Sequence, residues 1–188
     1  MAQQLLGKQL VRQLPGGLRI SGEIAETEAY LGLEDPACHS FSGKITPRTS
    51  TLYLPAGHSY VYFVYGMHHC FNVVCGDQSQ PEAVLIRALR ITEGWEQILA
   101  SRGHEPLSPR QRETVASGPA KLCRALSIDL SLNRLDLTTS EQIFIEEPRG
   151  AEALPKPGLG PLGFMALPRV GIDYAGDAAL WPLRFVLA

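Results

Sequence analysis

Glu-Ile-Ala-Glu-Thr-Glu-Ala-Tyr occupies residues 23–30, and Tyr-Val-Tyr-Phe-Val-Tyr-Gly-Met occupies residues 60–67. Cys38-His39 lies between these stretches, and Phe71-Asn72 follows the second one. Carboxylates, a histidine, clustered tyrosines and an asparagine therefore gather between residues 23 and 72. Aromatic faces suit flat unsaturated rings, and a carboxylate among them can activate water. The combination suggests a pocket that stacks a nucleobase and hydrolyses a bond to it.

The whole chain has 188 residues, of which 45% are hydrophobic, and this predicts a single domain over residues 1–188 with a substantial core. No run of eighteen apolar residues occurs and the N-terminus has no long apolar signal core, so we expect a cytoplasmic protein with no membrane partner. The net charge of −2 argues against a DNA binder that acts through its whole surface. A local basic strip is still possible, because residues 102–134 hold six Lys/Arg against three Asp/Glu.

The four cysteines show no Cys-x-x-Cys spacing, and we expect them to be reduced and mostly buried. A metal site built from His68, His69, Cys70 and Cys75 is disfavoured, because side chains on one strand alternate between its two faces. We therefore predict neither a metal nor another cofactor.

Short elements dominate the predicted secondary structure. Residues 18–24 alternate after the turn at residues 15–17, and the strand can continue to Tyr30, which would place Glu28 and Tyr30 on the face of Leu18, Ile20 and Ile24. Residues 59–64 and 69–75 predict a hairpin, and residues 83–89 a central strand. Further strands are expected at 143–145, 169–172 and 183–186, helices at 92–102, from 108 and from 118, and loops at 33–55 and 148–161. The expected fold is α+β: a curved, mostly antiparallel sheet flanked by helices.

Glu28 and Arg87 are the first candidates for chemistry. An arginine within the apolar run 83–89 is costly to bury unless a carboxylate pairs with it, and Glu28 is a natural partner if both strands line one pocket. One interpretation is a purely structural ion pair. The other makes Glu28 a general base, with Arg87 orienting the carboxylate or its water.

The aromatic and polar candidates also have two interpretations. Tyr60, Tyr62 and Tyr65 could be ordinary strand residues with wet hydroxyls, and His39 could be a surface histidine. However, Tyr65 at a hairpin tip would be exposed, as a wedge entering a base stack must be. Asn72 is a polar residue in an apolar strand and needs a partner or a role.

Taken together, several ordered motifs resemble one family, the alkyladenine (3-methyladenine) DNA glycosylases of the mammalian-enzyme type. The similarity covers nearly the whole chain. It is carried by the segments at residues 25–32, 38–40, 46–48, 60–67, 70–72, 84–89, 117–126 and 169–172. The sequence departs from the mammalian pattern in a longer, more acidic turn at residues 76–82, and at His68 and Trp181.

The resemblance implies a role for each matching residue. Glu28 would activate water for attack at the sugar C1′, and Arg87 would hold that site. Tyr30, His39 and Tyr62 would stack on the flipped base, and Asn72 would exclude guanine. Tyr65, with Met67 beside it, would intercalate into the duplex. Lys44, Thr46 and Arg48 would contact the DNA backbone. The same likeness implies a hairpin at 59–75 that enters the minor groove.

The expected function is hydrolytic excision of alkylated or deaminated purines (3-methyladenine, 7-methylguanine, hypoxanthine, ethenoadenine) from double-stranded DNA, the first step of base-excision repair. The enzyme would be monofunctional, without a Schiff-base lysine, and would act as a monomer on the DNA of a bacterial-type cytoplasm with no obligate protein partner. Two alternatives have other functions: a non-catalytic module that binds damaged DNA, and an N-glycosidase of small nucleosides.

Overall fold

Two long antiparallel strands, β2 (Arg19–Tyr30) and β5 (Ala83–Glu93), form the centre of the fold. The computed structural model describes residues 1–103, 105–148 and 163–187. Over these residues the sheet has eight strands in the order β3-β4-β5-β2-β1-β6, with β8 paired to both β2 and β7. The other strands are β1 (Gln9–Gln13), β3 (Ser59–Val64), β4 (His68–Val74), β6 (Ile143–Glu146), β7 (Phe164–Leu167) and β8 (Arg184–Leu187).

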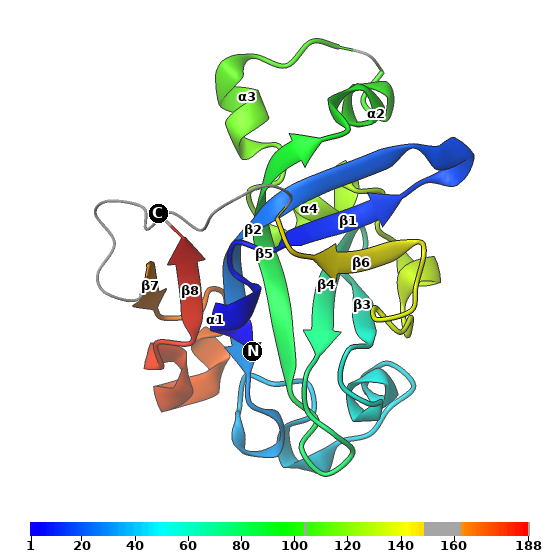
Figure 1. Cartoon of the computed structure of the whole chain (residues 1–188). Coiled ribbons are helices and arrows are strands. Elements are labelled where there is room, and N and C mark those ends of the chain that lie inside the picture. Colours follow the sequence, from blue (N-terminus) through cyan, green and yellow to red (C-terminus); the bar gives the residue numbers. More distant parts are fainter. Residues whose placement is uncertain (104, 149–162, 188) are drawn as a thin grey trace.

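The curvature of the sheet follows from how β2 is shared. The first half of β2 pairs with β1, and its residues Glu26–Glu28 pair with β8. On the other edge, β5 pairs with nearly the whole length of β2. All of these pairings are antiparallel. The sheet curls into a half-barrel with short helices around it (Figure 1). The predicted α+β class, with a curved antiparallel sheet, is therefore confirmed.

The described residues form four α-helices, all of them short. They are α1 (Ala2–Leu5), α2 (Trp95–Ala100), α3 (Pro109–Thr114) and α4 (Pro119–Ala125). α3 begins with the capping box that its sequence predicts, since Ser108 and Gln111 cap each other's backbone N–H groups. α2 begins later than predicted, because residues 92 and 93 still belong to β5 and Gly94 turns the chain with φ +87°. α2 and α3 lie at one end of the sheet, and the loops around residues 31–57 lie at the other (Figure 1). No helix in the described part of the chain is long and apolar enough to cross a membrane.

The main core lies on one face of the central strands. Phe71, Val73, Val84 and Ile86 point into it and pack with α4 and α1, and Phe71 and Ile86 are completely buried. Burying one such side chain stabilises the fold by about 1.5–3 kcal/mol. The residues between them on β4 and β5 face the opposite side of the sheet, which leaves that side for a pocket.

Three register shifts interrupt the pairing of β2 with β5: one lies between Ser21 and Gly22, and the other two lie between Ile24 and Thr27. Ile24 pairs with Leu89 and Glu26 pairs with Ala88, so Ala25 is an extra residue on β2. The next pair is Thr27 with Ile86, so Arg87 is an extra residue on β5. A bulge inverts the alternation of side chains beyond it. The prediction that Glu28 and Tyr30 share a face with Ile20 and Ile24 is therefore wrong, because those isoleucines belong to the main core and Tyr30 lines the opposite face.

Three other predicted segments have different outcomes. Residues 169–172 form no strand, because Arg169 turns into the protein and Gly171 has φ +74°; the strand there is β7, just before them. The predicted loop at 33–55 contains only short 3-10 turns: Gly32–Glu34, Phe41–Gly43 and Thr49–Tyr53. Most of the predicted loop at 148–161 lies outside the described residues.

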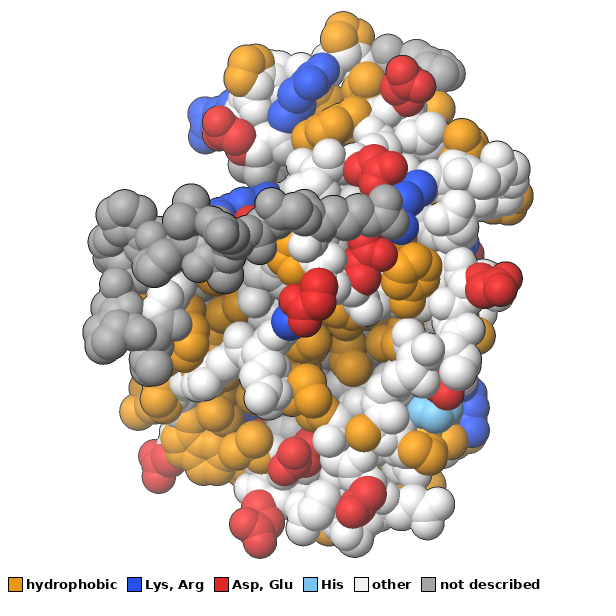
Figure 2. All heavy atoms as spheres, viewed as in Figure 1, with side chains coloured by type: hydrophobic (Ala, Val, Ile, Leu, Met, Phe, Trp, Pro, Cys, Tyr) orange, Lys and Arg blue, Asp and Glu red, His pale blue; other side chains and the backbone are white. Residues whose placement is uncertain are grey.

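The molecular face that carries α1 shows hydrophobic and acidic side chains with few basic ones among the described residues (Figure 2). A surface of this kind offers no basic patch for a phosphate backbone. This distribution agrees with the net charge of −2.

Candidate active site

A pocket of about 350 Å³ opens on the face of the sheet opposite the main core. The strand register explains which side chains are on this face of the sheet: Glu28 and Asn72 both pair with Leu85, and Tyr30 pairs with Ala83. Residues on directly opposed positions share a face of the sheet. Loops complete the walls, and the lining residues include Tyr30, His39, Arg48, Tyr62, Tyr65, Asn72, Arg87, Val170 and Tyr174.

Glu28 lies directly behind one wall of this pocket, with a side chain that is completely buried. Its Oε2 accepts a hydrogen bond of 2.8 Å from the Tyr30 hydroxyl, and its Oε1 accepts one of 2.8 Å from the backbone N–H of Val170. Arg87 Nη1 lies 3.3 Å from the same Oε1. A carboxylate has about four lone-pair positions, and the two hydrogen bonds occupy one on each oxygen, while Arg87 adds an ion pair at Oε1. One position on Oε2 thus remains for a further donor such as water.

Arg87 reaches Glu28 because of the bulge on β5. Its Nε donates to Glu26 Oε1 at 2.9 Å, and Glu26 Oε1 also lies 3.1 Å from Arg184 Nη1. Burial lowers the pKa of the Arg87 guanidinium, but the charges of Glu28 and Glu26 outweigh this and raise it overall. The predicted pairing of Glu28 with Arg87 is present, and Glu26 is a second partner that the sequence did not reveal.

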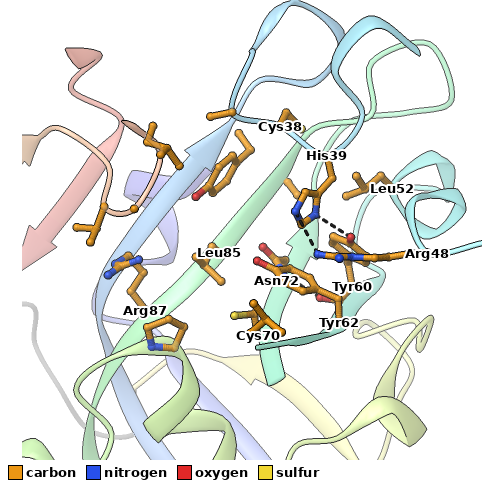
Figure 3. Close-up of a pocket in the computed structure, with 18 of the residues that line it drawn as sticks. Cys38, His39, Arg48, Leu52, Tyr60, Tyr62, Cys70, Asn72, Leu85 and Arg87 are labelled. Carbon is orange, nitrogen blue, oxygen red and sulfur yellow. Dashed lines mark hydrogen bonds between the residues drawn. The ribbon is translucent and has the colours of Figure 1, made fainter. Parts of the chain in front are cut away.

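A cluster of three rings forms the wall across the pocket from Arg87. His39 Nδ1 and the Tyr60 hydroxyl are 2.9 Å apart, and the His39 and Tyr62 rings meet edge to face at 4.8 Å (Figure 3). Arg48 Nη2 lies 3.2 Å from His39 Nε2, and since a guanidinium can only donate, Nε2 must accept and Nδ1 carries the proton. Burial first, and then the charge of Arg48, lower the pKa of His39 to about 4, so the imidazole is neutral at pH 7.

Asn72 is 3% exposed on the pocket floor. Its side-chain nitrogen donates to the Tyr60 carbonyl at 3.0 Å. This bond fixes the orientation of the amide group, and it gives the polar residue in an apolar strand the partner that it needs.

A buried ion pair supports Tyr30 from outside the pocket. Arg169 Nη2 donates to Asp35 Oδ1 at 2.9 Å and both side chains are fully buried. Asp35 also accepts from the N–H groups of Leu31 and Ala37, and the Arg169 guanidinium lies 4.8 Å from the centre of the Tyr30 ring. Burial alone raises the pKa of Asp35, but the hydrogen bonds from Arg169 and the backbone lower it overall. This pair was not predicted from the sequence, although an arginine inside the apolar segment 164–172 was a signal for it.

The hairpin of β3 and β4 ends in a three-residue connection, Tyr65-Gly66-Met67, whose Tyr65 lies at the pocket mouth; Tyr65 and Gly66 are the central residues of its turn. Both residues have positive φ, +53° and +69°, as a type I′ turn requires. Tyrosine is uncommon in this conformation, which costs free energy. Tyr65 is 85% exposed and Met67 is 70% exposed, so the predicted protruding side chains are present.

The three residues predicted to contact a DNA backbone lie in different surroundings. Lys44 is exposed, and Thr46 caps a turn through hydrogen bonds with Thr49. Arg48 instead turns into the pocket, where its guanidinium lies 4.4 Å from the centre of the Tyr62 ring. The described residues contain no group of three or more His, Cys, Asp or Glu that could hold a metal ion.

A buried carboxylate therefore stands beside a pocket with aromatic walls, an arrangement that suits hydrolysis of a bond to a flat ring. Comparison with known proteins agrees with this class. The family model of methylpurine-DNA glycosylase (MPG) matches residues 1–188. The chain belongs to this family.

Related proteins carry the same kind of name. The chain is 45% identical over 190 residues to a protein of Desulfitobacterium hafniense named "Putative 3-methyladenine DNA glycosylase", covering 100% of this chain and 88% of that protein. Proteins of the same name from Methanocella arvoryzae and Bacillus cereus are 43% and 41% identical, covering 98% of this chain in both cases and 84% and 88% of their own lengths.

The buried ion pair behind Tyr30 predicts a large effect on stability. Replacing Asp35 by Asn leaves the Arg169 charge buried without a carboxylate, so we expect the free energy of unfolding to fall by about 3–5 kcal/mol in urea denaturation. The matched control is Glu147→Gln, which removes the exposed ion pair with Lys8 and should cost about 1 kcal/mol or less. Equal losses in the two variants would contradict the structural importance of the buried pair.

The lowered pKa of His39 predicts how stability depends on pH. The unfolded chain binds a proton at His39 near pH 6.5 whereas the folded protein binds it only near pH 4, so acid favours unfolding between these values. From pH 7 to pH 5 the wild-type protein should lose about 1–2 kcal/mol of unfolding free energy relative to His39→Gln. Denaturant titrations of both proteins at the two pH values measure this, and parallel pH profiles would show that His39 titrates normally.

Proposed function

We propose that this protein is a monofunctional DNA glycosylase that hydrolyses the N-glycosidic bond of flipped alkylated or deaminated purines in double-stranded DNA. The observation that carries the proposal is the combination of the Glu28–Arg87 network with aromatic pocket walls and an exposed hairpin tip beside them. Membership of the glycosylase family supports the reaction class.

In the proposed mechanism Glu28 accepts the proton of a water that attacks C1′ of the flipped nucleotide. The free acceptor position on Oε2 is where that water would bind, and the N–H of Val170 together with Arg87 holds the other oxygen in place. None of the described residues lining the pocket is a lysine, which supports release of the base by water rather than through a Schiff base.

The aromatic residues provide the proposed recognition of the base. Tyr30 stacks on one side, and His39 with Tyr62 on the other. Electron-rich rings attract the positive charge of purines alkylated at N3 or N7. Asn72, fixed by its bond to the Tyr60 carbonyl, would oppose the exocyclic amino group of normal guanine.

The hairpin tip and the loop beside it would hold the DNA. Tyr65 would fill the space left by the flipped nucleotide, because it is exposed at the pocket mouth, and Met67 is an exposed residue of the same hairpin tip. Lys44 and Thr46 lie in the loop that leads to this wall and would contact phosphates. Flipping costs a few kcal/mol and less at damaged pairs, which adds to discrimination.

The direct test uses duplexes with a single hypoxanthine, ethenoadenine or 7-methylguanine. After incubation with the protein, alkali cleaves the strand wherever a base has been released, and we expect product from at least one of these lesions. Absence of product from all of them, with folded protein, would overturn the proposed function. Tight binding to the lesions without cleavage would instead favour a non-catalytic module.

The role of Glu28 is tested by Glu28→Gln against the matched variant Glu26→Gln. Both remove a carboxylate partner of Arg87, but only Glu28 has the acceptor position beside the pocket. We expect single-turnover excision to fall by about 10²–10⁴-fold in Glu28→Gln and by less than about tenfold in Glu26→Gln. Undiminished excision by Glu28→Gln would rule out this residue as the base.

Tyr65→Ala separates action on duplex DNA from action on nucleosides. Removing the exposed side chain should lower excision from a duplex by about tenfold or more, because no side chain then occupies the space that the flipped nucleotide leaves in the base stack. The fold should be unchanged, since Tyr65 is 85% exposed. An enzyme of small nucleosides would be unaffected by this substitution, so equal duplex activity would favour that alternative.

A further inference from the structure

Arg48 lines the mouth of the pocket, in a position that the proposed function leaves unexplained. Its guanidinium lies 4.4 Å from the centre of the Tyr62 ring and donates to His39 Nε2 at 3.2 Å (Figure 3). Tyr62 and His39 are the two rings proposed to stack on one side of the base. A base that enters the pocket therefore meets this guanidinium.

No carboxylate in the described part of the chain neutralises the charge of Arg48. The other arginines around the pocket differ in this respect: Arg87 pairs with Glu26 and Glu28, and Arg169 pairs with Asp35. Among the described residues no Asp or Glu forms an ion pair with Arg48. An uncompensated positive charge beside a binding pocket disfavours a second positive charge there.

Neutral purines interact differently with a guanidinium. Hypoxanthine presents O6 and N7 as acceptors on one edge, which is the edge that arginine commonly reads by two hydrogen bonds. A purine methylated at N7 has lost one of these acceptors and carries positive charge. The same guanidinium thus offers hydrogen bonds to the neutral base and repulsion to the cationic one.

We propose that Arg48 is a specificity-determining residue of this pocket, which favours neutral purines such as hypoxanthine over cationic N-methylated purines. This inference rests on the proposed glycosylase function and narrows its substrate class. It also differs from a backbone contact: a residue that binds only phosphate affects all lesions alike, whereas Arg48 affects their ratio. The residue is exposed at the pocket mouth, so its substitution should leave the core intact.

The test compares single-turnover excision of hypoxanthine and of 7-methylguanine in the same duplex. We expect Arg48→Gln to raise the ratio of 7-methylguanine to hypoxanthine excision by about tenfold, and Arg48→Lys, which keeps the charge, to stay closer to wild type. Lys44→Gln is the matched control, because it removes an exposed charge from the same loop and should lower both rates together. A ratio in Arg48→Gln within about twofold of wild type would overturn the proposal.

A second measurement needs no lesion and no activity. Because Arg48 contacts His39, its charge should act on the imidazole, and Arg48→Gln should raise the pKa of His39 by roughly half a unit or more in an NMR titration. An unchanged His39 titration would show that the guanidinium does not act inside the pocket, which overturns the inference. Failure of the wild-type protein to excise any lesion would instead overturn the proposed function, while the His39 titration still decides where Arg48 acts.

Discussion

The offset bulges of β2 and β5 are the constraint on which the site depends. In an uninterrupted pair of strands, Glu28 would continue the face of Ile24 and point toward the main core. The extra residue at Ala25 inverts this alternation, and the extra residue at Arg87 brings its guanidinium toward the same face. The hydrogen bond from the Gly118 N–H to the Arg87 carbonyl, at 2.9 Å, gives the bulged backbone a partner from α4. Two local irregularities thus convert a structural strand pair into a charged site.

Burying these charges is costly, and the surrounding structure shows how the cost is offset. Glu28 accepts two hydrogen bonds and forms an ion pair with Arg87, and Asp35 has Arg169 and two backbone N–H groups. Each buried carboxylate therefore has an opposite charge and further hydrogen bonds, which is the condition under which buried ions are tolerated. The two networks meet at Tyr30, whose hydroxyl binds Glu28 while its ring faces Arg169. The position of this ring is consequently determined by both.

The sequence predicts the strands and the main residues of this site better than it predicts the bulges and long-range contacts that bring them together. The hairpin, the strand through residues 83–89 and the pairing of Glu28 with Arg87 all follow from alternation and from the cost of an isolated buried arginine. The bulges do not: Glu26 already makes the alternation in residues 23–30 imperfect, but nothing in that pattern says where an extra residue is inserted in the register. The Asp35–Arg169 pair joins residues 134 positions apart, and only the folded chain brings them together. The side chain of Arg48 turns toward the pocket because its guanidinium contacts the rings of Tyr62 and His39 there, and these contacts cannot be read from its neighbours in sequence.

The charges around the pocket lead to a consequence for catalysis. A cationic alkylated base already has a weakened glycosidic bond, so it needs little more than a positioned water, whereas a neutral base leaves as an anion unless it is protonated or receives hydrogen bonds. A fixed positive group at the base-binding wall stabilises developing negative charge on a departing neutral purine. Arg48 is the pocket arginine without a carboxylate partner in the described residues, so its full charge is available for this purpose. The charge of Arg48, which disfavours binding of cationic bases, would therefore assist the departure of neutral purines, whose glycosidic bonds break less readily without help.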